Sequence, residues 1–172
     1  MKGLLIVLLL TTGFTTFAFV PGQREGGGGN VLAAEFASVG RIALEILGRG
    51  DDSLDVISIL EAIKSTKITP VRNICFLDLN TGSQSCFTAY YNASENEIKF
   101  NNREWKELNC RSKMMLASHE YLRVAGVETE DYKFSGRFLL GNFVREGMDF
   151  DESLKLRVYV HSVCADIEGG KQ

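Results

Sequence analysis

Residues 71–91 read VRNICFLDLNTGSQSCFTAYY, and this stretch places a β-sheet in the fold. Two runs rich in β-forming residues, Val71–Leu79 and Cys86–Tyr91, flank the turn sequence Asn80-Thr81-Gly82-Ser83. Two such runs on either side of a turn signal predict a pair of strands. Apolar and polar residues alternate over Glu97–Phe100, which predicts a third strand.

Helical patterns come before this stretch. Apolar residues recur at helical spacing over Val31–Leu47 and form one stripe, which Gly48 and Gly50 end. A second helix is predicted over Leu54–Ile63, after residues that can cap it. Pro70 is expected to close this helical region, because proline cannot donate to a helix ladder.

The second half of the chain is predicted to hold a helix-rich stretch and a final strand. The expected elements are a short helix over Arg103–Leu108, a stronger helix over Ser112–Ala125 that stops at Gly126, a partly helical segment over Tyr132–Val144, and a strand over Leu154–Cys164. The strand is predicted because apolar residues alternate with polar ones along it. The order of elements favours an α+β fold with N-terminal helices, a small antiparallel sheet, a motif-bearing helix and a C-terminal strand.

The first residues have the layout of a cleavable secretory signal. Lys2 supplies the positive start, Leu4–Leu10 form an apolar run, and small residues follow. We expect residues 1–18 to be the signal, with cleavage after Ala18 or at a site up to residue 22. An uncleaved membrane anchor is the alternative, although threonines and a glycine interrupt the apolar run that a span would need.

The mature chain is predicted to begin with a flexible leader and to continue as one domain. Residues 19–30 contain four consecutive glycines and no nucleotide-binding motif around them, so they are predicted to be a Gly-rich leader. Residues 31–168 are then a single α+β domain, because about 150 residues suffice for one core.

The four cysteines are even in number and follow an export signal, which makes two disulfides plausible. Cys75 and Cys86 would lie nearly opposite each other on two strands joined by the turn, so we favour Cys75–Cys86 together with Cys110–Cys164. A zinc site built from cysteines is the competing interpretation, without a C-x-x-C spacing to support it. The signal and the even number of cysteines together predict an exported protein that folds outside the reducing cytosol.

Charge narrows the classes of partner. The formal net charge is −3, and it becomes −4 when Lys2 leaves with the signal. A general nucleic-acid binder would carry a basic excess, so nucleic acid is not an expected partner. No segment after the signal is long and apolar enough to span a membrane. An unknown protein or envelope component is the expected partner.

One constellation that could carry chemistry lies in residues 118–138, SHEYLRVAGVETEDYKFSGRF. His119 and Glu120 open the H-E-x-x-H pattern of metalloprotease helices, in which two histidines bind zinc and the glutamate is the general base. Arg123 stands at the second histidine position and cannot coordinate a metal. In the longer pattern Gly126 fits the glycine position, but Thr129 replaces the third ligand.

Three interpretations of this degenerate zincin-like motif remain. His119 and His161 could bind zinc together with Glu128, Glu130 or Asp131, leaving Glu120 as general base. Alternatively, His119 only forms a hydrogen bond in a partly buried place, and Glu120 only pairs with an arginine. In the third interpretation the charge of Arg123 occupies the place of a metal and stabilises Glu120 as an anion.

These residues resemble a group of uncharacterised small exported proteins of Gram-negative, predatory-type bacteria. The group carries a helix reading roughly H-E-x-L, followed by G-[IV]-E, a tyrosine and a serine. The matching residues here are His119, Glu120, Leu122, Gly126, Val127, Glu128, Tyr132 and Ser135, with Ile98, Phe100, Asn101 and Trp105 upstream and Gly29, Asn30 and Glu35 near the start. Arg123 departs from the small residue that the group has at this position.

The resemblance implies a shared fold and a binding pocket, and it adds no support for protease activity because the group generally lacks the second histidine. The implied pocket residues are His119, Glu120, Glu128, Tyr132 and Ser135, and we add Arg123 to this predicted pocket because of its place on the helix. The resemblance also implies a location in the periplasm or outside the cell. The preferred prediction is an exported, non-catalytic binding or envelope-associated domain without a cofactor. The alternative is an atypical metal-dependent hydrolase with zinc on His119, His161 and an acid, and Glu120 as base. A purely structural role of the motif is the third hypothesis.

Overall fold

The computed structural model describes residues 30–141 and 147–169. The predicted signal and nearly all of the Gly-rich leader lie outside the described residues, as does the end of the segment predicted over 132–144. The elements are α1 (Val31–Gly50), α2 (Val56–Ala62), the 3-10 helix η1 (Ile63–Ser65), β1 (Lys67–Val71), β2 (Cys75–Leu77), β3 (Gln84–Cys86), β4 (Ala89–Asn92), β5 (Glu97–Asn101), α3 (Asn102–Glu107), α4 (Cys110–Val124), α5 (Arg137–Leu140) and α6 (Phe150–Gly169). The predicted α+β class is confirmed.

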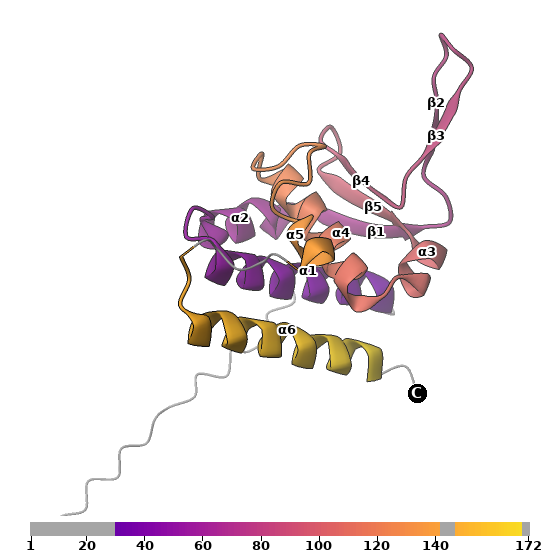
Figure 1. The fold of residues 1–172 in the computed structure, drawn as a ribbon. Helices are drawn as coiled ribbons and strands as arrows, with labels where there is room; N and C mark the ends of the chain where they lie inside the picture. The colour runs from indigo at the N-terminus through magenta and orange to yellow at the C-terminus, as the bar shows by residue number, and fades with distance from the viewer. Residues whose placement is uncertain (1–29, 142–146, 170–172) are drawn as a thin grey trace, which may run out of the picture.

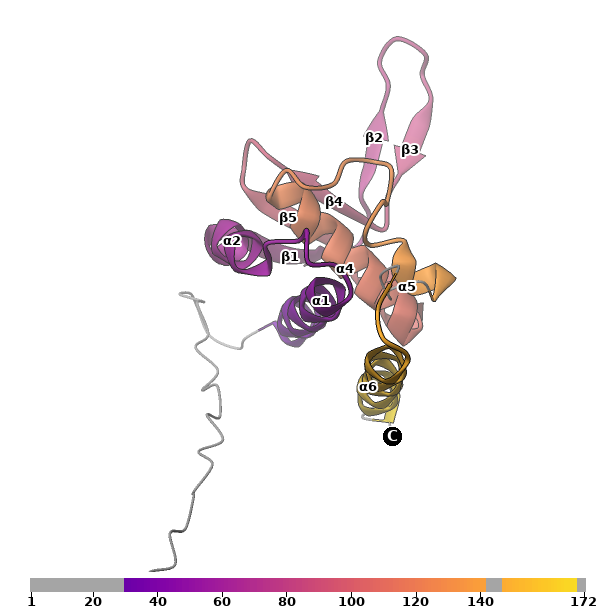
Figure 2. The ribbon, with the colours of Figure 1, turned by 60° about the vertical axis from the view of Figure 1, so that its left-hand side comes forward.

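Figures 1 and 2 show α1 and α4 together between the small sheet and α6. The helix α1 starts where predicted, because the side-chain oxygen of Asn30 accepts hydrogen bonds from the amides of Leu32 and Ala33. Its apolar stripe is buried, and the Phe36 ring packs against the rings of Phe100 and Trp105. This aromatic cluster ties α1 to the sheet and to α3, and so fixes the platform on which α4 lies.

The three-stranded sheet has the order β1-β5-β4, with β4 antiparallel and β1 parallel to β5. The predicted antiparallel pairing is therefore found between β4 and β5, whereas β1 adds a parallel pair that was not predicted. A tight turn, in which Asn96 has φ +46°, reverses the chain between β4 and β5. Because the chain has already reversed direction before β4, this second reversal brings β5 back alongside β1 in the same direction.

Pro70 lies inside β1, where it pairs with Phe100, and does not end the helical region as predicted. The N-terminal helical region, from α1 to η1, ends at Ser65, and β1 begins two residues later. β1 is an edge strand of its sheet, and proline is tolerated there because an edge strand has amides that need no ladder partner.

The strands β2 and β3 form a separate antiparallel hairpin that projects away from the body of the domain (Figures 1 and 2). Cys75 pairs with Cys86 in its register, and the two are joined by a disulfide. The predicted long strands Val71–Leu79 and Cys86–Tyr91 are each divided, the first between β1 and β2 and the second between β3 and β4.

The predicted C-terminal strand is wrong, because residues 154–164 belong to the 20-residue helix α6. Leu156 and Val160 are buried against the body of the domain, whereas Leu154 and Val158 face solvent. Each pair has the i, i+4 spacing of one helix face. The two stripes are offset by two residues, so together they produce the alternation that a strand would show.

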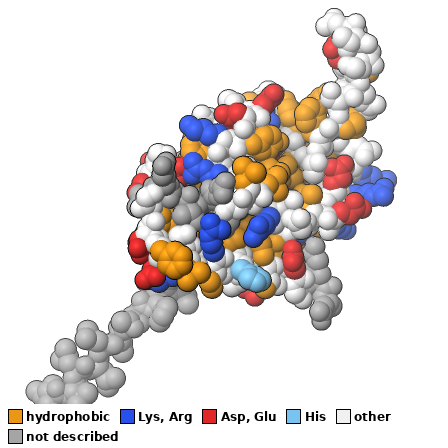
Figure 3. Space-filling model, in the orientation of Figure 1, with side chains coloured by type: hydrophobic (Ala, Val, Ile, Leu, Met, Phe, Trp, Pro, Cys, Tyr) orange, Lys and Arg blue, Asp and Glu red, His pale blue; other side chains and the backbone are white. Residues whose placement is uncertain are grey.

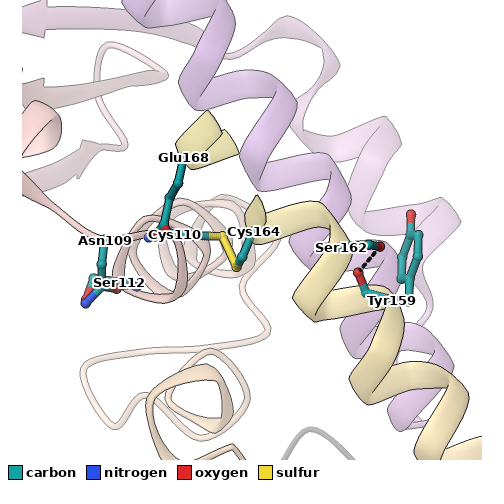
Figure 4. Close-up of a disulfide and its surroundings, with 7 residues drawn as sticks. All are labelled: Asn109, Cys110, Ser112, Tyr159, Ser162, Cys164 and Glu168. Carbon is teal, nitrogen blue, oxygen red and sulfur yellow. Dashed lines mark hydrogen bonds between the residues drawn. A yellow bond between two sulfur atoms is a disulfide. The ribbon is translucent and has the colours of Figure 1, made fainter. Parts of the chain in front are cut away.

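A second disulfide joins Cys110, at the start of α4, to Cys164 in α6 (Figure 4). The Glu168 carboxylate accepts a hydrogen bond from the Cys110 amide at 3.1 Å, while Asn109 caps α4 by accepting from the Ser112 amide. Both favoured cysteine pairings therefore form. Across residues 30–141 and 147–169, no helix combines the length and the apolar character that a bilayer crossing requires.

Candidate functional site

The helix α4 carries His119 and Glu120 in its third turn, and both side chains are buried. A helix turns by about 100° per residue, so His119, nine residues after Cys110, lies about half a turn away from it. Cys110 faces α6, and His119 therefore faces the opposite side. What covers His119 there is the segment that follows α4.

His119 is held by two contacts from that segment. Its Nδ1 lies 2.9 Å from Oε2 of Glu128 in a buried hydrogen bond. The ring of Tyr132 stacks on the imidazole, with centroids 3.9 Å apart and planes 11° from parallel. His119 therefore forms the hydrogen bond that the second interpretation predicted, but in a fully buried position instead of a partly buried one. Its Nε2 has no hydrogen-bond partner among the described residues.

Glu128 anchors the segment to α4. Its Oε1 accepts hydrogen bonds from the amides of Phe134 and Ser135 at 2.6 and 3.0 Å, while Oε2 takes His119. Burial raises the pKa of Glu128, but the hydrogen bonds with His119 and with residues 134 and 135 outweigh it and hold the pKa below its usual value. Glu128 is therefore a buried carboxylate that stays ionised.

Two residues with a left-handed backbone conformation determine the path of the chain after α4. Gly126, with φ +68°, ends α4 as predicted, and the amides of Val127 and Glu128 then donate to the carbonyl of Leu122. Tyr132 also has a positive φ, +49°, which is uncommon for a side chain of its size. This conformation places its ring over His119, and the stacking contact holds it there.

Glu120 lies next to this pair and has a different environment. Burial raises its pKa, although the charges of Arg123 and His119 and the backbone amide of Tyr91 oppose the rise. Its Oε2 has no hydrogen-bond partner among the described residues, and Nη1 of Arg123 lies 3.8 Å from it. Glu120 pairs with an arginine, as predicted, but at a distance longer than a hydrogen bond.

Arg123 links the buried site to the surface. Its side chain is 26% exposed, and its guanidinium lies over the ring of Tyr90, 5.8 Å from the centroid. Tyr132, which stacks on His119, is 42% exposed. We call Tyr90, Arg123 and Tyr132 the tyrosine–arginine surface. It is the accessible side of a site whose acidic and imidazole groups are buried.

The predicted metal pair is not brought together. His161 lies on the exposed side of α6, in a hollow lined by Arg111, Leu139 and the Cys110–Cys164 disulfide, whereas His119 faces the opposite side of α4. Residues 30–141 and 147–169 contain no group of three or more histidine, cysteine, aspartate or glutamate side chains able to hold a metal. The donor set therefore does not fit the zinc site of the alternative prediction.

The remaining predicted residues divide between the buried site and the surface. Ser135 is buried and joins the site through its amide. Thr129, Glu130 and Asp131 are exposed, so Glu128 is the only acid of the 128–131 stretch that faces His119. Glu128 was predicted as a pocket residue and as one of three alternative metal ligands, but its pairing with His119 was not predicted.

Comparison of the chain with protein-family models, with curated proteins and with solved structures gave no match.

Proposed function

We propose that the protein is an exported, non-catalytic binding module, in which the zincin-like helix α4 serves as a scaffold. The observation that carries this proposal is the position of Arg123. It occupies the second ligand position of the motif and sets its guanidinium 3.8 Å from Glu120, the residue that would be the general base. A guanidinium has no lone pair for a metal.

The chemistry of the other groups supports the same proposal. A general base of this kind must be ionised and must reach a water molecule. Glu120 is buried, and burial raises its pKa, which favours the uncharged form. The ring of Tyr132 covers one face of the His119 imidazole, and Nδ1 is hydrogen-bonded to Glu128. Only Nε2 of His119 is therefore left to bind a metal.

The tyrosine–arginine surface is the proposed binding surface. A cation beside aromatic rings favours a partner that offers a carboxylate or phosphate group, because arginine binds such groups with two parallel hydrogen bonds. Aromatic and arginine side chains are also the residues that contribute most to protein interfaces. A protein or envelope component with an acidic group is the expected partner.

Export is part of the proposal. Its support is the signal-like start of the sequence, the two disulfides, and the resemblance to small exported bacterial proteins. Fractionation of the native cells, followed by determination of the N-terminal residue of the protein, tests it. A mature chain starting between residues 19 and 23 is expected, and full-length protein in the cytosol would contradict it.

Metal analysis tests the non-catalytic part. Elemental mass spectrometry of the purified mature protein should find substoichiometric zinc that His119→Ala does not change. Stoichiometric zinc that is lost in His119→Ala would support the hydrolase instead.

The binding part needs a separate measurement on native envelope fractions. Arg123→Gln should weaken retention of the protein on these fractions while leaving the unfolding midpoint close to that of the wild type. Arg111→Gln, on an exposed arginine away from this surface, is the matched control and should be retained normally. Equal retention of all three proteins would rule out the tyrosine–arginine surface.

A further inference from the structure

The β2–β3 hairpin exposes an apolar surface that begins beside Tyr90 and extends toward the tip of the hairpin. Leu77 is 59% exposed and Leu79, near the tip, is 88% exposed. Phe76 and Phe87 are about half exposed and pack against each other and Tyr90 at the base. Figure 3 shows hydrophobic side chains gathered where the hairpin leaves the body. Exposed apolar groups on a projecting element indicate an interaction site.

The hairpin is also fixed in shape before any partner arrives. The Cys75–Cys86 disulfide closes its base. At the tip Asp78 accepts hydrogen bonds from the amides of Asn80 and Thr81 and from the Thr81 hydroxyl. A preorganised element loses little conformational entropy when it binds, which favours association.

The outer edge of β2 is open for a further strand. The amide of Phe87 donates to the carbonyl of Ile74, and the amide of Asp78 donates to that of Ser83, so residues 74, 76 and 78 direct their backbone groups toward β3. Backbone groups alternate in direction along an antiparallel strand. Cys75 and Leu77 therefore direct theirs outward, and no strand of the described residues pairs with them.

The charged residues beside this edge indicate which strand could pair with it. Between residues 72 and 88 the only charged side chains are Arg72 and Asp78, each three positions from Cys75. Arg72 is exposed and has no ion-pair partner among residues 30–141 and 147–169. Hydrogen bonds from Thr81 and Asn80 hold the pKa of Asp78 below its usual value, so Asp78 is charged.

We propose that two copies of this chain pair through β2, antiparallel, about a two-fold axis at Cys75. A two-fold interface places residue 75 + n of one copy opposite residue 75 − n of the other. Asp78 then meets Arg72 of the other copy at both ends, and the outward backbone groups of Cys75 face each other. The apolar side chains of the two hairpins are brought together across the new sheet.

A lipid surface fits this hairpin less well. The tip carries the ionised Asp78, and an acidic residue is costly in the hydrocarbon region of a bilayer. No basic residue lies between Ile74 and Thr88 to attract anionic headgroups. A second copy satisfies both the open edge and the charge of Asp78.

Analytical ultracentrifugation of the mature protein, with its disulfides intact, tests the proposal. The wild type should be a dimer in reversible exchange with monomer. Asp78→Arg and Arg72→Asp should each weaken dimerisation about tenfold or more, because each places like charges opposite one another twice. The double variant, with the charges exchanged, should restore the dimer, and Glu61→Arg on α2 should leave it unchanged.

A protein that stays monomeric at every concentration tested would overturn the proposal. A dimer that ignores both charge reversals would overturn the pairing through β2. The tyrosine–arginine surface is not needed for this dimer, so Arg123→Gln should dimerise normally, and the failure of either proposal can be recognised separately.

Discussion

Nδ1 of His119 and Oε2 of Glu128 lie 2.9 Å apart in a place that solvent hardly reaches. The contact joins α4 to the segment that returns over it, and this segment also brings Tyr132 onto the imidazole. Metal-binding histidines usually donate the N–H of their second ring nitrogen to a carboxylate, a backbone carbonyl or a water molecule. Here the supporting carboxylate is present, while Arg123 replaces the second ligand, so the arrangement orients the histidine without completing a metal site.

Glu128→Gln should lower the free energy of unfolding by about 2 kcal/mol or more, because a buried, hydrogen-bonded carboxylate is replaced by a group that accepts less strongly. Urea unfolding at neutral pH measures the change. Glu130→Gln, on an exposed carboxylate two residues later, is the control and should change stability little. Equal effects of the two substitutions would contradict the anchoring role of Glu128.

Acid unfolding should depend on Glu97. Hydrogen bonds from Thr69, Lys67 and Lys99 outweigh the effect of burial and lower its pKa from 4.5 to about 2. The stabilisation is therefore present above about pH 4.5 and is lost as the pH falls toward about 2.

Glu97→Gln should accordingly cost about 2 kcal/mol at neutral pH, an amount reduced from the full linkage value because Lys67 is exposed. Its stability should also fall less steeply than that of the wild type over the acid range. Denaturant unfolding at a series of pH values tests this, and parallel pH curves for the two proteins would be the contrary result.

The fold could be predicted from the sequence wherever one periodicity dominated. The stripes of α1 and α4 each have one buried face, so their helices were predicted to within a few residues. The Cys75–Cys86 pairing followed from the turn between two β-rich runs. In α6 two interleaved stripes, represented by Leu156 and Val158, imitated strand alternation. No local pattern could reveal which of those stripes the body of the domain would cover.

The position of the candidate site could be predicted from the sequence, but the contacts between its residues could not. The motif pointed to His119 and Glu120, and Arg123 was correctly placed beside Glu120. The partner of His119 depends on the path of the chain after Gly126, which is set by long-range packing of the returning segment. Spacing alone could not show that Glu128 turns inward while Glu130 faces solvent.

Glu120→Gln should fold normally and be at least as stable as the wild type at neutral pH. Burial raises the pKa of Glu120 above 4.5, so the wild type loses stability as the pH rises above that value, whereas glutamine has no charge to bury. Thermal unfolding at neutral pH measures this. If the Glu120→Gln variant also loses retention on envelope fractions, a purely structural role of the motif is ruled out. A strongly destabilised variant would contradict this prediction and would show that the contact between Glu120 and Arg123 stabilises the fold.

Removal of the Cys110–Cys164 disulfide, by Cys110→Ser with Cys164→Ser, should lower the free energy of unfolding by about 4 kcal/mol, because this disulfide closes a long loop. The matched double substitution at Cys75 and Cys86 removes a disulfide that closes a much shorter loop, so it should lower the free energy of unfolding less. Urea unfolding without reductant compares the two. A larger loss from the hairpin disulfide would contradict the expectation that the disulfide closing the longer loop stabilises the protein more.

Zinc titration of the wild type beside Arg123→His tests the central claim most directly. The substitution places a second histidine four residues after His119. In His119 itself, Nε2 has no hydrogen-bond partner among the described residues and Nδ1 is hydrogen-bonded to Glu128. Isothermal titration calorimetry should find no zinc site in the wild type and one new site in Arg123→His, with Arg123→Ala as the control that gains none. A wild-type protein that binds one zinc, and loses it in His119→Ala, would contradict the claim that Arg123 stands in the place of a metal ligand.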